Sequence, residues 1–119
     1  MKKLFVLLAF VAFSCGKPLP RLEGIDMRQW KDDKFGCLGF REKSLDTFSS
    51  QKDKLKGLSE TDILQLLGRP DQNELYKRNQ KFFHYFVEPS VKCDSSKRNT
   101  RKLSIRFNAM ERAKEIVIE

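Results

Sequence analysis

Apolar residues recur along this chain with two different spacings, one in its first half and one in its second. In the first half they stand three or four residues apart, which is the spacing of a helix that buries one side. This pattern predicts a short helix over residues 25–34 and a longer one over residues 41–54. In the longer helix Leu45, Phe48 and Leu55 share one face, with serine and lysine elsewhere.

A third helix has the clearest start and stop signals. Ser59 is placed to cap its first turn, and Asp62, three residues later, is a weaker form of the residue that completes a capping box. Gly68 and Pro70 end the helix, because glycine readily takes the left-handed conformation and proline cannot continue the helical hydrogen bonds. We therefore expect a helix over residues 60–67.

In the second half the spacing of apolar residues changes to two, as in strands. Over residues 101–108 apolar and polar residues alternate, which predicts one buried and one solvated face, whereas residues 81–88 carry aromatic side chains on both faces. Four strands are predicted, over residues 74–77, 81–88, 101–108 and 112–119. The last strand would lie at the edge of the sheet, where it could accept a partner strand. Its charged residues could equally protect this edge against aggregation. Helices followed by such strands indicate an α+β fold, with two or three short helices packed on one face of a three- to four-stranded antiparallel meander sheet.

The N-terminal residues have the order of a secretory signal peptide. Lys2 and Lys3 precede an uncharged apolar run, and small residues lead up to Cys15. The run is shorter than the roughly 17–25 residues of a membrane-spanning helix. A cysteine at this place resembles the lipobox of bacterial lipoproteins, in which that cysteine becomes the acylated N-terminus. The alternative is an ordinary cleavage site, formed by Ala12 and Ser14, at which Cys15 has no role.

These features predict the organisation of the chain. We expect residues 1–14 to be a signal peptide, residues 15–24 to be a lipidated N-terminus and tether, and residues 25–119 to be one small domain. Gly16 follows Cys15 at a position where lipoproteins of the inner membrane often carry aspartate. The resemblance therefore favours a periplasm-facing lipoprotein of the outer membrane in a Gram-negative bacterium.

Two further cysteines, Cys37 and Cys93, suggest a disulfide in an oxidising envelope. It would close a loop of about 57 residues, for which chain entropy predicts a stabilisation of about 4 kcal/mol. Two separated cysteines and one histidine have no recognisable spacing for a metal site, so we expect neither a metal nor another cofactor.

The chain is basic, with 24 Lys+Arg, 16 Asp+Glu and a formal net charge of +8. An exported protein rarely meets nucleic acid, so we expect no nucleic-acid partner. One basic cluster is either a solvated loop or a contact for anionic lipid or an acidic partner. Its members are Lys92, Lys97, Arg98, Arg101, Lys102 and Arg106.

The sequence offers little catalytic chemistry. His84 is the only histidine and lies within an aromatic strand, where a structural role at a half-buried face is the expected one. No motif places a nucleophile and an orienting acid beside it, and no glycine-rich phosphate loop is present. We therefore expect a protein that is not an enzyme.

Residues 57–119 resemble the SmpA/OmlA domain of the BamE-like lipoproteins. The matching features are Gly57-Leu58-Ser59 before the helix, Leu67-Gly68-Arg69-Pro70 after it, Phe83-His84-Tyr85 in one strand and Ile105-Arg106-Phe107 in another. The resemblance implies two helices on a three-stranded antiparallel sheet, and an accessory role beside the machine that assembles outer-membrane β-barrels. It implies no particular partner-binding residue.

Three functions remain open at this point. The first is a lipid-anchored envelope adaptor that supports outer-membrane protein assembly or envelope integrity by contacting other envelope proteins. The second is a periplasmic protein inhibitor, which would use this same α+β fold to block an enzyme. The third is a structural lipoprotein with no dedicated partner.

Overall fold

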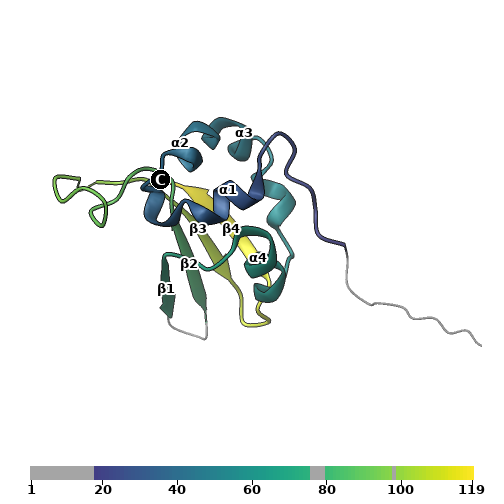
Figure 1. The fold of residues 1–119 in the computed structure, drawn as a ribbon. Helices are drawn as coiled ribbons and strands as arrows, with labels where there is room; N and C mark the ends of the chain where they lie inside the picture. Colours follow the sequence, from purple (N-terminus) through teal and green to yellow (C-terminus); the bar gives the residue numbers. More distant parts are fainter. Residues whose placement is uncertain (1–17, 76–79, 98) are drawn as a thin grey trace, which may run out of the picture.

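The computed structural model describes residues 18–75, 80–97 and 99–119. In this part of the chain, short helices precede a four-stranded antiparallel sheet, which is the expected α+β fold (Figure 1). The helical elements are α1 (Met27–Asp32), η1 (Lys34–Gly36), α2 (Phe40–Lys43), α3 (Leu45–Ser49), η2 (Lys52–Leu55) and α4 (Glu60–Leu67). The strands are β1 (Gln72–Leu75), β2 (Lys81–Phe86), β3 (Lys102–Phe107) and β4 (Ala113–Ile118), in that order across the sheet.

Helix α4 has the predicted boundaries. The Ser59 hydroxyl accepts a hydrogen bond from the Asp62 amide at 3.1 Å, and the Ser59 amide donates to the Asp62 carboxylate at 3.3 Å. This is the reciprocal capping box expected of the pair. Gly68 ends the helix with a φ of 85°, and its carbonyl accepts a hydrogen bond of 2.8 Å from the Tyr85 hydroxyl.

The single helix predicted over residues 41–54 is wrong, because the structure divides this segment into α2, α3 and η2. The first break lies at Ser44, whose hydroxyl donates to the Phe40 carbonyl at 2.8 Å. Serine competes in this way with backbone hydrogen bonds and is a poor residue for a helix interior. Leu45, Phe48 and Leu55 are nevertheless all buried, so the apolar spacing identified the correct face.

One face of the sheet packs against the helices and forms the core. Its buried side chains alternate along β2 and β3, and they meet Trp30 of α1 and Phe48 of α3. Trp30 and Phe48 stack with their ring centroids 5.2 Å apart. The alternation predicted for residues 101–108 is therefore confirmed in β3, whereas Phe83, His84 and Tyr85 are buried in succession in β2. Strand β1, whose four residues are all exposed, begins two residues before the predicted 74–77, of which 76 and 77 lie outside the described residues.

A buried ionic network joins the helical layer to the sheet. The Arg41 guanidinium donates to the Asp71 carboxylate at 2.8 Å and to the carbonyls of Trp30 and Phe86 at 2.9 and 3.0 Å. Asp71 also accepts the Phe86 amide at 2.8 Å. Arg41 therefore ties α1, α2 and the end of β2 together at one point.

The folded part of the chain extends into the segment expected as a tether. Leu22 is buried in the core, and the Gln51 side chain exchanges two hydrogen bonds with the Glu23 backbone, at 2.7 and 2.8 Å. The Lys54 ammonium also donates to the Arg21 carbonyl at 2.8 Å, so the contact with the domain begins before Leu22. Across the described ranges, no helix has both the length and the apolar character needed to cross a bilayer.

Candidate functional site

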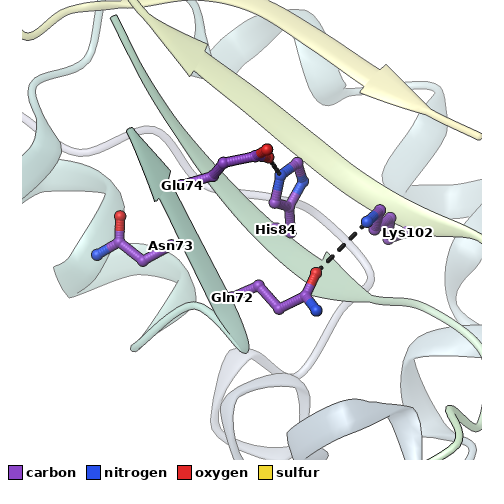
Figure 2. Close-up of a pocket in the computed structure, with 5 residues that line it drawn as sticks. All are labelled: Gln72, Asn73, Glu74, His84 and Lys102. Carbon is purple, nitrogen blue, oxygen red and sulfur yellow. Dashed lines mark hydrogen bonds and ion pairs between the residues drawn. The ribbon is translucent and has the colours of Figure 1, made fainter. Parts of the chain in front are cut away.

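The face of the sheet that points away from the helices is the most distinctive surface of the protein. We call it the open face. It has a hollow of about 540 Å³ over β2, β3 and β4, and a second of about 500 Å³ between β1 and β3 (Figure 2). The side chains of the open face are Gln72, Glu74, Phe82, His84, Phe86, Lys102, Ser104, Arg106, Glu115 and Val117.

His84 lies at the centre of this face and is held from three sides. Its Nδ1 lies 2.7 Å from the Ser104 hydroxyl and its Nε2 lies 2.8 Å from the Glu74 carboxylate. Its ring stacks on Phe82 with centroids 5.6 Å apart and planes 9° apart. Since an ionised carboxylate can only accept, the neutral ring carries its proton on Nε2 and accepts the Ser104 proton at Nδ1. Figure 2 shows Glu74 reaching from β1 across to His84.

This arrangement has the order of a nucleophilic triad, with a serine, a histidine and an orienting acid. Ser104 lies in the middle of β3, opposite His84 of β2 and Val117 of β4, so its backbone belongs to the hydrogen-bonded ladder of the sheet. An oxyanion hole needs free donors beside the nucleophile. Within the described residues, the backbone around Ser104 has no such free pair of N–H groups. The array therefore lacks a feature that acyl transfer needs, whereas its hydrogen bonds hold the side chains of this surface in fixed positions.

The charged side chains of the open face are paired with neighbours on the same face. Arg106 donates to Glu115 at 3.1 Å. Lys102 donates to Gln72 at 3.4 Å, and its ammonium lies 5.8 Å from the centre of the Phe86 ring. The surface thus presents both signs of charge and two aromatic rings in fixed positions.

Sequence reasoning assigned His84 a structural role and did not find its two partners. Glu74 and Ser104 lie 10 residues before it and 20 residues after it along the chain. Each occupies a polar position of an alternating strand, which is the one signal the sequence carries. Bringing them together requires the strand register, which pairs Ser104 with His84 and Glu74 with Phe82.

The basic residues predicted to form one cluster do not share one surface. Lys102 and Arg106 lie on the open face. Arg101 donates to the Glu88 carboxylate at 2.6 Å, and this hydrogen bond holds the pKa of Glu88 below its usual value. The Lys92 ammonium lies 5.3 Å from the centre of the Phe35 ring. Lys97 is exposed in the loop before β3, and Arg98 lies outside the described residues.

A disulfide joins Cys37 to Cys93, with their Cα atoms 5.4 Å apart. It fastens the loop after β2 to the segment after η1. In Figure 1 this loop extends on the opposite side of the domain from the point where residue 18 leaves it. Cys15, the predicted lipidation site, lies outside the described residues.

The two edges of the sheet differ, and the edge predicted to be open is largely covered. Along β4, Ala113 exchanges backbone hydrogen bonds of 2.8 Å with Gly57 and Leu58, and the Lys52 ammonium donates to the Ile116 carbonyl at 3.1 Å. The connection between η2 and α4 therefore blocks the start of β4. The opposite edge is β1, whose four residues are all exposed.

Metal ligation finds no support in the part of the chain that the structure describes, where no three histidine, cysteine, aspartate or glutamate side chains are grouped to hold an ion. Comparison with known proteins found no matching family model, no matching curated protein and no matching solved structure. The resemblance to the SmpA/OmlA domain therefore stays a prediction from sequence.

Proposed function

We propose that this protein is an adaptor of the bacterial envelope, anchored by lipid at Cys15 and facing the periplasm from the outer membrane. Its open face would bind another envelope protein during outer-membrane protein assembly or in the maintenance of the envelope. The observation that carries this proposal is the open face itself. It is a sheet surface that none of the described helices covers (Figure 1), and its side chains are held in place by one another.

Such a surface suits protein recognition for two reasons. Side chains that are ordered before binding lose little conformational freedom when a partner arrives, so less of the binding energy is spent on ordering them. Phe82 and Phe86, both partly exposed, supply aromatic area, while Glu74, Glu115 and Arg106 supply paired charges of both signs. An anionic lipid surface would select cations alone, so the mixed charge favours a protein partner.

The loop that carries Lys92 and Lys97 is a second contact region within this proposal. It lies away from the point where residue 18 leaves the domain (Figure 1). A domain standing upright on a short tether would direct this loop away from the anchoring bilayer. We therefore favour an acidic protein surface over anionic lipid headgroups as the contact for these two lysines.

Site-specific photo-crosslinking in native membranes tests the proposal. A benzophenone amino acid at Val117 reports on the open face, and the same amino acid at Asp46, exposed on α3, is the matched control on the helical side. We expect Val117 to crosslink to outer-membrane assembly proteins and this crosslink to disappear in Cys15→Ala. Crosslinking from Asp46 alone would refute docking through the open face. Crosslinking to one soluble enzyme, both with and without Cys15, would show that the protein is an inhibitor and not an adaptor.

The proposal also holds that the protein is not an enzyme, and Ser104 allows a direct test. A fluorophosphonate probe reacts with serine hydroxyls activated by a neighbouring base. We expect no labelling of the purified protein, and the same result for a Ser104→Ala control. Labelling that is lost in Ser104→Ala would show that the serine, histidine and glutamate array is catalytic.

A further inference from the structure

We propose that β1 is a binding edge that takes an extended segment of a partner protein as a fifth strand of the sheet. The inference deepens the proposed docking role, because it names the chemistry of the partner. It starts from the difference between the two edges. The molecule covers the start of β4 with Gly57 and Leu58, and the Lys52 ammonium bonds the outer side of this strand. Among the described residues, by contrast, β1 pairs with β2 alone.

The register shows which backbone groups of β1 are offered. The Val87 amide donates to the Arg101 carbonyl, so the backbone of Val87 bonds toward β3. The Lys102 and Glu119 backbones bond each other in the same way between β3 and β4. Bonding direction alternates along each strand, so His84 and Phe82, an odd number of residues from Val87, bond toward β1. Their partners are Gln72 and Glu74. Asn73 and Leu75 are then left with their N–H and C=O groups directed away from the sheet.

A groove accompanies this edge on the helical side. It has a volume of about 400 Å³ and runs between α4 and β1, with Leu64, Pro70 and Asn73 among its lining residues. The Lys81–Glu60 ion pair, at 3.0 Å, lies in its wall. Leu64 is 39% exposed, and Leu75, on the same side of β1 as Asn73, is 75% exposed. The groove therefore offers apolar contacts to alternate side chains of an added strand.

The opposite side of the edge has a different character. Gln72 and Glu74 point to the open face, while Asn73 points away from them (Figure 2). The Glu74 carboxylate is more than half exposed and would attract a cation. The occupant is thus an extended polypeptide in which apolar residues alternate with basic ones. Only such a backbone supplies donors and acceptors at the spacing that Asn73 and Leu75 present.

Fluorescence anisotropy with a defined probe tests this assignment. The probe is a fluorescein-labelled seven-residue peptide in which valine alternates with lysine, and the control peptide has glutamate in place of lysine. Asn73→Pro removes the outward N–H while proline remains tolerated at a sheet edge, and Asn73→Thr keeps the N–H. We expect Asn73→Pro to weaken peptide binding by about tenfold or more, because the peptide loses one backbone hydrogen bond to β1 and the alignment that this bond provides. Asn73→Thr should bind as the natural chain does.

Amide hydrogen exchange on the unmodified protein keeps the test independent of the variants. Binding should slow exchange at Asn73 and Leu75 and leave β4 unchanged. Four results would each overturn the proposal. The two Asn73 variants could bind the peptide equally well, or the glutamate peptide could bind as tightly as the lysine peptide. Protection from exchange could be confined to β4, or the lysine peptide could fail to bind at millimolar concentration. A dimer in sedimentation that Asn73→Pro abolishes would assign the edge to a second copy and overturn the partner assignment.

The two proposals can fail separately. Crosslinks from Val117 that persist while the peptide does not bind would remove strand addition and leave the adaptor. Peptide binding at β1 without any envelope crosslink from Val117 would leave a peptide-binding domain and remove the open face as its docking surface.

Discussion

The buried pair of Arg41 and Asp71 gives the most direct test of how this domain is held together. Asp71→Asn keeps the shape of the side chain and removes its charge. The Asp71 carboxylate accepts hydrogen bonds from Arg41 and from the amides of Phe35 and Phe86, at 2.8, 3.1 and 2.8 Å. An asparagine has one acceptor oxygen in place of two, so one of these donors would face an NH₂ group.

The size of the effect follows from burial. The side chains of Arg41 and Asp71 are only 1% and 3% exposed, so water cannot solvate the Arg41 charge that Asp71→Asn leaves unpaired. Removing one partner of a buried pair leaves the other charge uncompensated and costs about 3–5 kcal/mol. A small domain has a total stability of about 5–15 kcal/mol, so the variant should stand near the limit of folding.

Urea denaturation followed by Trp30 fluorescence measures this loss. Trp30 is the only tryptophan, it is buried, and it lies 4.4 Å from the Arg41 guanidinium. The matched control is Glu115→Gln, which removes a charge from the exposed pair with Arg106 and should cost no more than about 1 kcal/mol. If Asp71→Asn and Glu115→Gln have the same free energy of unfolding, the buried network does not stabilise the fold as argued.

Three further predictions follow from local geometry. A Cβ at Gly36, which has φ +70°, would overlap the Glu88 carbonyl oxygen, whereas Gly39, at φ +81°, has open space around it. Gly36→Ala should therefore cost about 3 kcal/mol or more and Gly39→Ala about 1 kcal/mol, both measured by urea denaturation; equal costs would contradict the close approach. Replacing Cys37 and Cys93 together by serine should lower stability by about 4 kcal/mol because it opens a long loop, and an unchanged urea midpoint would refute that stabilisation. The pKa of Glu88 is lowered by folding, so its stabilising effect is complete above its ordinary value of 4.5 and is lost as the pH falls through the lowered value. The stability difference between the natural chain and Glu88→Gln should accordingly be larger at pH 7 than at about pH 3, and a difference independent of pH would contradict the assignment.

The parts of the fold that the sequence predicted are those set by neighbouring residues. The capping box and Gly68 define α4 locally, and the alternation in β3 shows which side chains are buried. Arg41 could not be predicted as a core residue, because its partners Asp71 and Phe86 lie 30 and 45 residues away and nothing in its neighbourhood signals them. Apolar spacing alone also does not reveal the break in the predicted helix.

The candidate site was less accessible to sequence reasoning than the fold. The alternating strands indicated that Ser104 and Glu74 lie on polar faces, but only the register places them against His84. The same register divides the basic residues between the open face and the loop after β2. The covered edge of β4 depends on Gly57 and Leu58 folding back against it, which is a contact between distant segments.

The clamp on the N-terminal segment determines where the domain would carry mechanical load. Six residue steps separate Cys15 from Arg21, a reach of at most about 20 Å when fully extended. Any pull along this segment meets the fold at Arg21, whose carbonyl accepts from Lys54, at Leu22, which is buried in the core, and at Glu23, whose backbone bonds the Gln51 side chain. Tension along it would therefore reach the fold through Gln51 and Lys54, at the end of the helical layer that precedes α4.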